Sequence, residues 1–186
     1  MRVIAGTYRG RALTPVGKGD AGAHLRPTTD RTRESLFNVL AGGRFGDPIP
    51  GARVLDLFAG TGALGLEALS RGAAHVTFVD DGRVAQKLVA ANIKLLGAEA
   101  TTRLFRADAT RLPACIDAPF DLVFLDPPYG KGLGETALSA AISGGWIAED
   151  ALILWEESAA ITPPEGLTLL DARRYGDTTI HFLEPA

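Results

Sequence analysis

The sequence predicts a doubly wound α/β domain on a mostly parallel sheet of seven strands, with an antiparallel hairpin at one edge and a small N-terminal extension. Three observations predict this fold. From Arg53 onward, short apolar runs alternate with helical stretches about every 20–25 residues, which is the pattern of βαβ units. Runs such as Leu122-Val123-Phe124-Leu125 lack polar alternation, as expected for strands covered by helices on both faces. The 186 residues, 46% of them hydrophobic, are enough for about one domain.

The same pattern locates the individual elements. Strands are expected near 53–57, 75–80, 102–106, 121–125, 151–156, 168–174 and 178–183. Helices are expected near 63–71, 83–96 and 133–143, the first two ended by Gly72 and Gly97. The last two strands are close enough in the sequence to pair as an antiparallel hairpin at the sheet edge.

The first 46 residues differ from the rest in charge. They carry eight Arg or Lys against three Asp or Glu, a net charge of +5, so the remainder carries −8. Residues 2–13 predict a small β-hairpin, and a helix is expected after Pro27 and ends at Gly42-Gly43. We expect 1–46 to be a basic, RNA-docking part of the same unit as 47–186, because phosphate neutralisation supplies much of nucleic-acid affinity. A solvated charged face is the alternative.

Several classes of protein are excluded by composition. No apolar run approaches the roughly 18 residues of a membrane span, and the first residues lack the apolar stretch of a secretory signal. We therefore expect a cytoplasmic protein. The single cysteine, Cys115, cannot form an internal disulfide. The three histidines, His24, His75 and His181, are scattered without metal-ligand spacing, so no metal site is expected.

A glycine-rich loop, Asp56-Leu57-Phe58-Ala59-Gly60-Thr61-Gly62, follows the first predicted strand of the sheet. In an open parallel sheet, ligands bind beyond the carboxyl ends of the strands. Gly60 and Gly62 allow a tight turn and a close approach of a ligand to the backbone. Together with Gly65 they also match the dinucleotide-binding spacing, and Asp80 lies where a ribose-binding acid is expected.

Two ligands therefore compete for this loop. Asp56 would repel a pyrophosphate at the helix N-terminus, whereas S-adenosylmethionine carries a sulfonium and an ammonium and suits a carboxylate there. Asp80, with Asp81 beside it, can accept the ribose hydroxyls. Asp108-Ala109, after the third strand, is placed to meet the adenine. Each aspartate could instead cap a turn or helix, but three acids after three successive strands favour S-adenosylmethionine.

The fourth strand runs into Asp126-Pro127-Pro128-Tyr129-Gly130. Two prolines fix φ and hold the chain extended, so that the Asp126 carboxylate and the Pro127 carbonyl become rigid acceptors. An exocyclic NH2 of a base has two hydrogens to give them, which favours a pyramidal nitrogen and aims its lone pair. Tyr129 can stack on a base that has been flipped out. The alternative is a rigid turn with a packed tyrosine.

These motifs resemble class I S-adenosylmethionine-dependent methyltransferases, and most closely the RsmD family of 16S ribosomal RNA guanine-N2 methyltransferases. The resemblance spans nearly the whole chain. It rests on Ile4-Ala5-Gly6-x-Tyr8-Arg9-Gly10-Arg11, on Leu25-Arg26-Pro27-Thr28 with Arg33-Glu34-x-Leu36-Phe37-Asn38, on Leu55 to Gly72, and on Asp126-Pro127-Pro128-Tyr129. The methyltransferase motifs are widely shared, so the two N-terminal motifs are the specific part.

The resemblance implies a Rossmann-like methyltransferase fold, S-adenosylmethionine as cofactor, and 16S rRNA of the small ribosomal subunit or its assembly intermediate as partner. A monomer is expected. The expected cofactor-binding residues are Asp56, Phe58, Ala59, Gly60, Thr61, Gly62, Asp80, Asp81, Asp108 and Ala109. The expected catalytic residues are Asp126, Pro127, Pro128 and Tyr129, and the expected RNA-binding residues are Arg2, Arg9, Arg11, Arg26, Arg31 and Arg33.

The chain departs from the family pattern at two places. Relatives commonly carry Glu where this chain has Asp80, and a second acid where it has Gly82, so Asp80 and Asp81 both stay candidates for the ribose. Because the family accepts Phe or Tyr after the prolines, the hydroxyl of Tyr129 is expected to be dispensable.

Other functions stay open at this point. Pro-Pro-aromatic motifs also serve adenine N6 and the amide of a protein glutamine. An NAD-dependent oxidoreductase would explain only the glycine spacing, and a non-catalytic RNA-binding module only the basic N-terminus.

Overall fold

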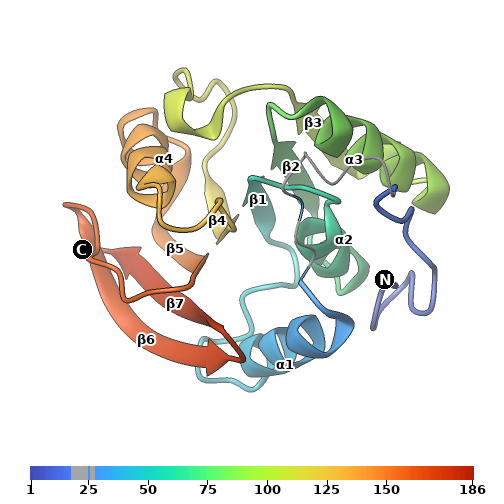
Figure 1. Ribbon diagram of the computed structural model, residues 1–186, viewed down its shortest axis with the longest axis horizontal. Helices are drawn as coiled ribbons and strands as arrows, with labels where there is room; N and C mark the ends of the chain where they lie inside the picture. The colour runs from blue at the N-terminus through green and yellow to red at the C-terminus, as the bar shows by residue number, and fades with distance from the viewer. Residues whose placement is uncertain (18–24, 26–27) are drawn as a thin grey trace.

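The computed structural model describes residues 1–17, 25 and 28–186. His24, Arg26 and Pro27, named above, lie outside the described residues. Seven strands form one sheet in the order β3-β2-β1-β4-β5-β7-β6 (Figure 1). They are β1 (Arg53–Leu57), β2 (His75–Val79), β3 (Thr102–Phe105), β4 (Phe120–Leu125), β5 (Ile147–Glu157), β6 (Leu167–Tyr175) and β7 (Thr178–Pro185). The first five are parallel, and β7 runs antiparallel between β5 and β6. The predicted architecture, edge hairpin included, is confirmed.

Four α-helices pack on this sheet: α1 (Asp30–Ala41), α2 (Ala63–Ser70), α3 (Arg83–Leu96) and α4 (Leu133–Ser143). The glycines end them as expected, because Gly97 closes α3 in the left-handed conformation and Gly42 caps α1. The N-cap of α1 is Thr29, whose hydroxyl accepts from the Thr32 N–H. No helix in the described part of the chain is long and apolar enough to cross a membrane.

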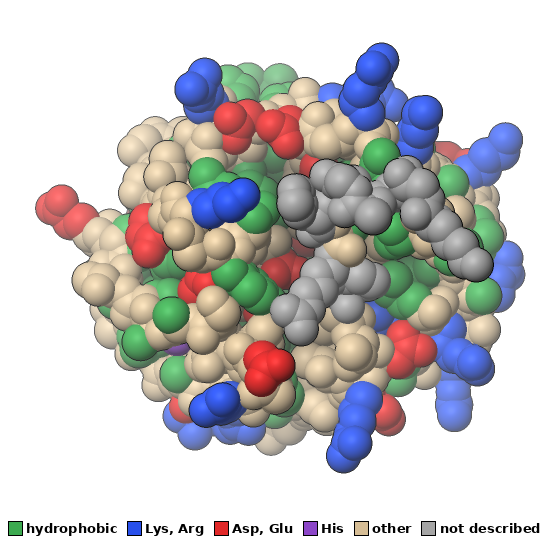
Figure 2. Space-filling view, in the orientation of Figure 1, with side chains coloured by type: hydrophobic (Ala, Val, Ile, Leu, Met, Phe, Trp, Pro, Cys, Tyr) green, Lys and Arg blue, Asp and Glu red, His purple; other side chains and the backbone are tan. Residues whose placement is uncertain are grey.

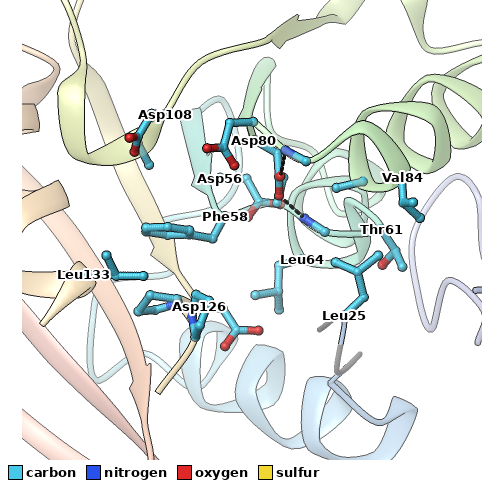
Figure 3. A pocket seen from close by; sticks show the side chains of 18 of the residues that line it. Leu25, Asp56, Phe58, Thr61, Leu64, Asp80, Val84, Asp108, Asp126 and Leu133 are labelled. Carbon is cyan, nitrogen blue, oxygen red and sulfur yellow. Dashed lines mark hydrogen bonds between the residues drawn. The ribbon is translucent and has the colours of Figure 1, made fainter. Parts of the chain in front are cut away.

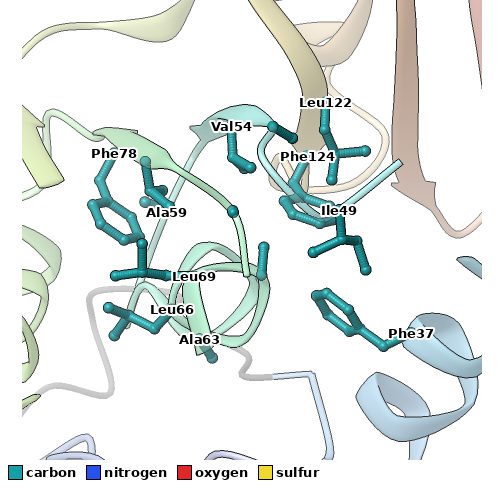
Figure 4. Packing of buried hydrophobic residues seen from close by; sticks show 14 of the residues in the cluster. Phe37, Ile49, Val54, Ala59, Ala63, Leu66, Leu69, Phe78, Leu122 and Phe124 are labelled. Carbon is teal, nitrogen blue, oxygen red and sulfur yellow. The ribbon is translucent and has the colours of Figure 1, made fainter. Parts of the chain in front are cut away.

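The central strands are apolar throughout because both of their faces are covered. Neighbouring residues on a strand point to opposite faces, so Val54 packs in one core with α1, α2 and α3, while Leu55 packs in a second core with α4. In the first core, the Phe37 ring of α1 lies 5.8 Å from the Phe124 ring of β4, measured between centroids (Figure 4).

One strand boundary differs from the sequence prediction. β5 begins at Ile147, four residues before the predicted start at Ala151. Glu149 and Asp150 in this stretch are exposed, and the pairing of β4 with β5 is irregular between Phe120 and Leu122. Because Glu149 and Asp150 point to solvent at this irregularity, they interrupt the apolar pattern, and the sequence alone places the start of the strand too late.

The N-terminal hairpin is smaller than predicted. Only its ends pair, through hydrogen bonds such as Val3 N–H to the Arg11 carbonyl, and one isolated bridge joins Arg2 to Ala12. The backbone N–H groups of Ile4 and Ala5 instead donate to the carboxylate of Glu67 on α2. The tip of the extension is thus docked on the helix that follows the glycine loop.

Candidate active site

A cavity of about 1070 Å³ opens at the carboxyl ends of the parallel strands (Figure 3). It lies where the strand order reverses between β1 and β4, which is the position that this class of sheet uses for ligands. Thirteen of the fourteen predicted cofactor and catalytic residues line it. They are Asp56, Phe58, Ala59, Gly60, Thr61, Asp80, Asp81, Asp108, Ala109, Asp126, Pro127, Pro128 and Tyr129. The structure therefore brings the predicted segments together around one cavity.

The loop between β1 and α2 is held in an unusual backbone conformation. Phe58, Gly60 and Gly62 all have positive φ, of 56°, 59° and 78°. For a phenylalanine this conformation costs energy, and such strain is found where a structure holds a loop ready for a ligand. Gly62, the one predicted residue that does not line the cavity, is the N-cap of α2. Its contribution is to the turn.

Asp56 is buried beneath this loop, with 2% of its surface exposed. Its Oδ2 accepts a hydrogen bond of 2.9 Å from the Gly65 N–H in the first turn of α2. A Cβ at residue 65 would lie 2.9 Å from that oxygen, so a glycine there lets the helix approach the carboxyl closely. Burial raises the pKa of Asp56 to about 8, and the negative charge of Asp80 contributes to the rise. A cationic ligand would favour its ionised form.

Asp80 connects two of the loops that line the cavity. Its Oδ2 accepts from the Gly60 N–H at 3.0 Å and its Oδ1 from the Gly82 N–H at 2.8 Å. Burial raises the pKa of this carboxyl, while the two backbone hydrogen bonds partly oppose the rise. Each oxygen has further acceptor capacity for a ribose hydroxyl. Asp81 also lines the cavity but is exposed, so it is the less constrained candidate for that contact.

Asp108 follows β3 and caps a short 3-10 helix, Ala109–Arg111. Its Oδ1 accepts from both the N–H and the hydroxyl of Thr110, and these hydrogen bonds lower the pKa of the carboxyl. The alternative that an aspartate here caps a turn is thus correct for Asp108. It lines the cavity as well, so capping and ligand contact are compatible.

The Asp126-Pro127-Pro128-Tyr129 segment leaves β4 beside β1, with the Asp126 N–H donating to the Leu57 carbonyl at 3.4 Å. Its peptide bonds are trans. Asp126 and Tyr129 are half-buried at the cavity wall and Pro127 is buried. This geometry places a carboxylate and an aromatic ring on the same wall.

Glu156 is a site residue that the sequence reasoning missed. It lies on β5 with 9% of its surface exposed. Its Oε1 accepts a 2.8 Å hydrogen bond from the Tyr129 hydroxyl, and its Oε2 accepts one of 3.4 Å from the Thr28 hydroxyl. The signal that could have found it is an acid directly after the apolar run Ala151 to Trp155, at a position predicted to belong to the same strand.

The predicted RNA-binding arginines separate into two groups. Arg2, Arg9, Arg11 and Arg31 are exposed, although one Arg11 Nη donates to the Leu95 carbonyl of α3. The prediction for Arg33 was wrong. Arg33 is 0% exposed and is paired with Asp30 at 3.0 Å and with Glu67 at 3.8 Å, so it cannot reach a phosphate. A buried guanidinium of this kind stabilises the fold.

No group of three or more His, Cys, Asp or Glu suited to a metal ion occurs within residues 1–17, 25 and 28–186.

Comparisons with known proteins agree with this site. Residues 1–184 match the family model described as Conserved hypothetical protein 95. Ribosomal RNA small subunit methyltransferase D of Escherichia coli K12 is 42% identical over 156 residues, covering 84% of this chain and 74% of that protein. The solved structure of yhhF from Escherichia coli superposes with a TM-score of 0.81 at 36% identity, covering 100% of this chain and 97% of that one.

A more distant relative has a different RNA substrate. The tRNA (guanine(6)-N2)-methyltransferase of Thermus thermophilus is 36% identical over 106 residues, which are 55% of this chain and 31% of that protein.

Proposed function

This chain belongs to the Conserved hypothetical protein 95 family, the RsmD family of ribosomal RNA methyltransferases, and we propose that it methylates the exocyclic N2 of a guanine in 16S rRNA. It is an S-adenosylmethionine-dependent rRNA methyltransferase. The observation that carries a planar amino nitrogen as the proposed target is the Asp126-Pro127-Pro128-Tyr129 wall, which lines the same cavity as Asp56 of the glycine loop.

The cavity fits S-adenosylmethionine by its chemistry. The carboxyls of Asp56, Asp80 and Asp108 line it, and the sulfonium and ammonium of this ligand are complementary to them. Burial keeps the Asp56 carboxyl under the N-terminus of α2 protonated near neutral pH, and a positive ligand beside it would stabilise its ionised form, whereas a pyrophosphate would not. The NAD-dependent alternative therefore lacks support from the site as well as from the family.

Bound S-adenosylmethionine supplies an electrophilic methyl group. Asp56 holds its positive end, and Asp80 accepts from its ribose. The Asp126 carboxylate and the Pro127 carbonyl accept the two hydrogens of the guanine NH2, which directs the nitrogen lone pair to the methyl group. Tyr129 stacks on the flipped base. When the nitrogen takes the methyl group, the electron pair of the broken carbon–sulfur bond stays on the sulfur, which becomes a neutral thioether. The nitrogen releases one proton, which the Asp126 carboxylate would accept.

The substrate is small-subunit rRNA in an assembled or assembling subunit, and the enzyme acts as a cytoplasmic monomer in this proposal. Guanine N2 is favoured over adenine N6 and over a protein glutamine because the relatives that match are named for rRNA and for guanine-N2 transfer.

The test is methyl transfer from labelled S-adenosylmethionine to unmethylated small subunits, followed by nucleoside digestion and mass identification. N2-methylguanosine is expected. N6-methyladenosine or label in protein would refute guanine as the target. Absence of S-adenosylmethionine binding would refute the proposal that the cavity is the cofactor site.

Asp126→Ala is expected to abolish transfer while the cofactor still binds. Asp117→Ala is the matched control, because Asp117 is an exposed acid paired with Arg103 on the surface. Retained turnover in Asp126→Ala would contradict the role given to this carboxylate.

A further inference from the structure

A second, smaller hollow lies on the surface of α3, outside the catalytic cavity. It encloses about 200 Å³ and is lined by Arg83, Gln86, Lys87, Ala90 and Arg106. The first four residues lie on one face of α3, because residues three and four apart are neighbours on a helix. Arg106 comes from the segment after β3. We call these five residues the α3 hollow. No acidic side chain lines it.

The cations of the α3 hollow are exposed and concentrated. None of the ion pairs found among the described residues includes Arg83, Lys87 or Arg106. The whole of α3 contains two lysines and one arginine but no Asp or Glu. In a chain with net charge −3, three like charges around one hollow repel one another unless an anion lies between them.

The position of the α3 hollow connects two parts of the proposed RNA surface. Arg83 lines both the hollow and the catalytic cavity, so the two open side by side. At the other end of α3, Arg11 of the N-terminal hairpin donates to the Leu95 carbonyl, and the Thr14 N–H donates to the Asn92 side chain. Lys and Arg side chains stand along the margin of the molecule where α3 and the hairpin lie (Figure 2).

We propose that the α3 hollow binds a backbone phosphate of the RNA, and that α3 continues the cationic surface of the N-terminal hairpin toward the cavity. The proposal rests on the function proposed above and adds a contact region that lies outside residues 1–46. Among the charged residues that line the cavity, acids outnumber cations: Asp56, Asp80, Asp81, Asp108 and Asp126 against Arg83 and Lys131. Cations at its rim would therefore favour the approach of an RNA backbone. Arginine forks and a lysine are the side chains that bind phosphate best.

The decisive variant is Lys87→Ala/Arg106→Ala, because neither residue lines the catalytic cavity. Binding to 16S rRNA is measured as a function of salt concentration, together with KM for small subunits and the cofactor Kd. The slope of log K against log salt should become shallower by about 1 to 2, since each lost phosphate contact removes about 0.7–0.9. KM for subunits should rise about 10-fold or more, with kcat and the cofactor Kd unchanged.

The matched control is Arg173→Ala/Arg174→Ala, which removes two cations of β6, outside residues 1–46, and gives the same net charge. An equal loss in this control, or an unchanged salt slope in the α3 variant, would overturn the proposal. Inorganic phosphate provides a further arm. Phosphate could raise the melting temperature of the wild type while the salt dependence of 16S rRNA binding is the same in the wild type and the α3 variant. In that case the α3 hollow binds a small anion, and the RNA proposal is refuted.

Failure of the proposed function would be visible separately. In that case the wild type binds 16S rRNA with the expected slope but transfers no methyl group to it. The binding measurement still tests the α3 hollow, because it needs no turnover.

Discussion

The hydrogen bond between Tyr129 and Glu156 should contribute to catalysis although neither oxygen takes part in the chemistry. The phenol hydroxyl donates to the buried Glu156 carboxylate at 2.8 Å, and this contact orients the ring that we propose to stack on the base. The perturbation is Tyr129→Phe, which keeps the aromatic ring and removes only the donor. Family resemblance predicted a dispensable hydroxyl, whereas this structure gives it a partner.

The magnitude follows from the type of hydrogen bond. A hydrogen bond to a charged group contributes about 1.5–3 kcal/mol, and removing the donor leaves a buried carboxylate with one partner fewer. If the ring is held in its stacking orientation by this contact, kcat/KM for small subunits should fall about 10- to 100-fold. The cofactor Kd should stay within about twofold, because the contact lies on the wall of the cavity that faces the base.

The assay is a double-mutant cycle with Tyr129→Phe, Glu156→Gln and the double variant. If the two residues act together, kcat/KM of the double variant should be close to that of the single variant with the larger loss. Tyr175→Phe is the matched control, since Tyr175 is a half-buried tyrosine on β6 that does not line the cavity. Additive losses, or a Tyr129→Phe enzyme within twofold of wild type, would show that the hydrogen bond does not position the ring.

Three further substitutions test the buried and strained groups. Burial raises the pKa of Asp56 to about 8, so the folded protein keeps a proton that the unfolded chain has lost above about pH 4. The free energy of unfolding should therefore fall by up to about 1.4 kcal/mol per pH unit from about pH 4 to 8. Asp56→Asn should abolish this pH dependence, measured by urea unfolding at several pH values. Gly6→Ala should lower the free energy of unfolding by more than about 2 kcal/mol, because the added Cβ would lie 1.8 Å from a carbonyl oxygen of α2. Gly10 also has a positive φ but open space around it, so Gly10→Ala should lower the free energy of unfolding by about 1 kcal/mol. Arg33→Met should lower the free energy of unfolding by about 3–5 kcal/mol, because it leaves the buried Glu67 with one partner fewer. Arg31→Ala, which changes an exposed arginine, is the control and should leave the free energy of unfolding unchanged. Equal melting temperatures for the two variants would contradict a structural role for Arg33.

Most of the fold was predictable because the sequence is locally consistent. Apolar runs of strand length, separated by helices that end at Gly42 and Gly97, leave few arrangements other than a doubly wound sheet. The start of β5 was not predictable, since Glu149 and Asp150 interrupt the apolar run at an irregularity in strand pairing. That irregularity depends on the neighbouring strand, which local pattern does not report.

The convergence of the predicted cofactor and catalytic residues on one cavity was predictable for a geometric reason. Parallel strands bring their carboxyl ends to one edge, so the residues that follow β1, β2 and β4 converge without any knowledge of tertiary contacts. Glu156 and Arg33 were not predictable in their roles, because each depends on a partner far away in the sequence. Glu156 meets Thr28 across 128 positions, and the charge of Arg33 is indistinguishable from that of a surface arginine until Glu67 is placed beside it.

A buried side chain, Asn92 on α3, bonds to both the N-terminal extension and the glycine loop. Its amide nitrogen donates to the Thr61 carbonyl in the glycine loop at 2.8 Å, and its oxygen accepts from the Thr14 N–H at 2.7 Å. A segment that helps to fix the loop is not a separable RNA-binding arm, which supports one folding unit for residues 1–46 and 47–186. Because the same extension carries the exposed arginines of the proposed RNA surface, a phosphate bound there acts on a segment already hydrogen-bonded to the loop beside the cavity. If RNA docks on this extension as we propose, the hydrogen bonds of Asn92 are one route by which it would act on the cofactor loop.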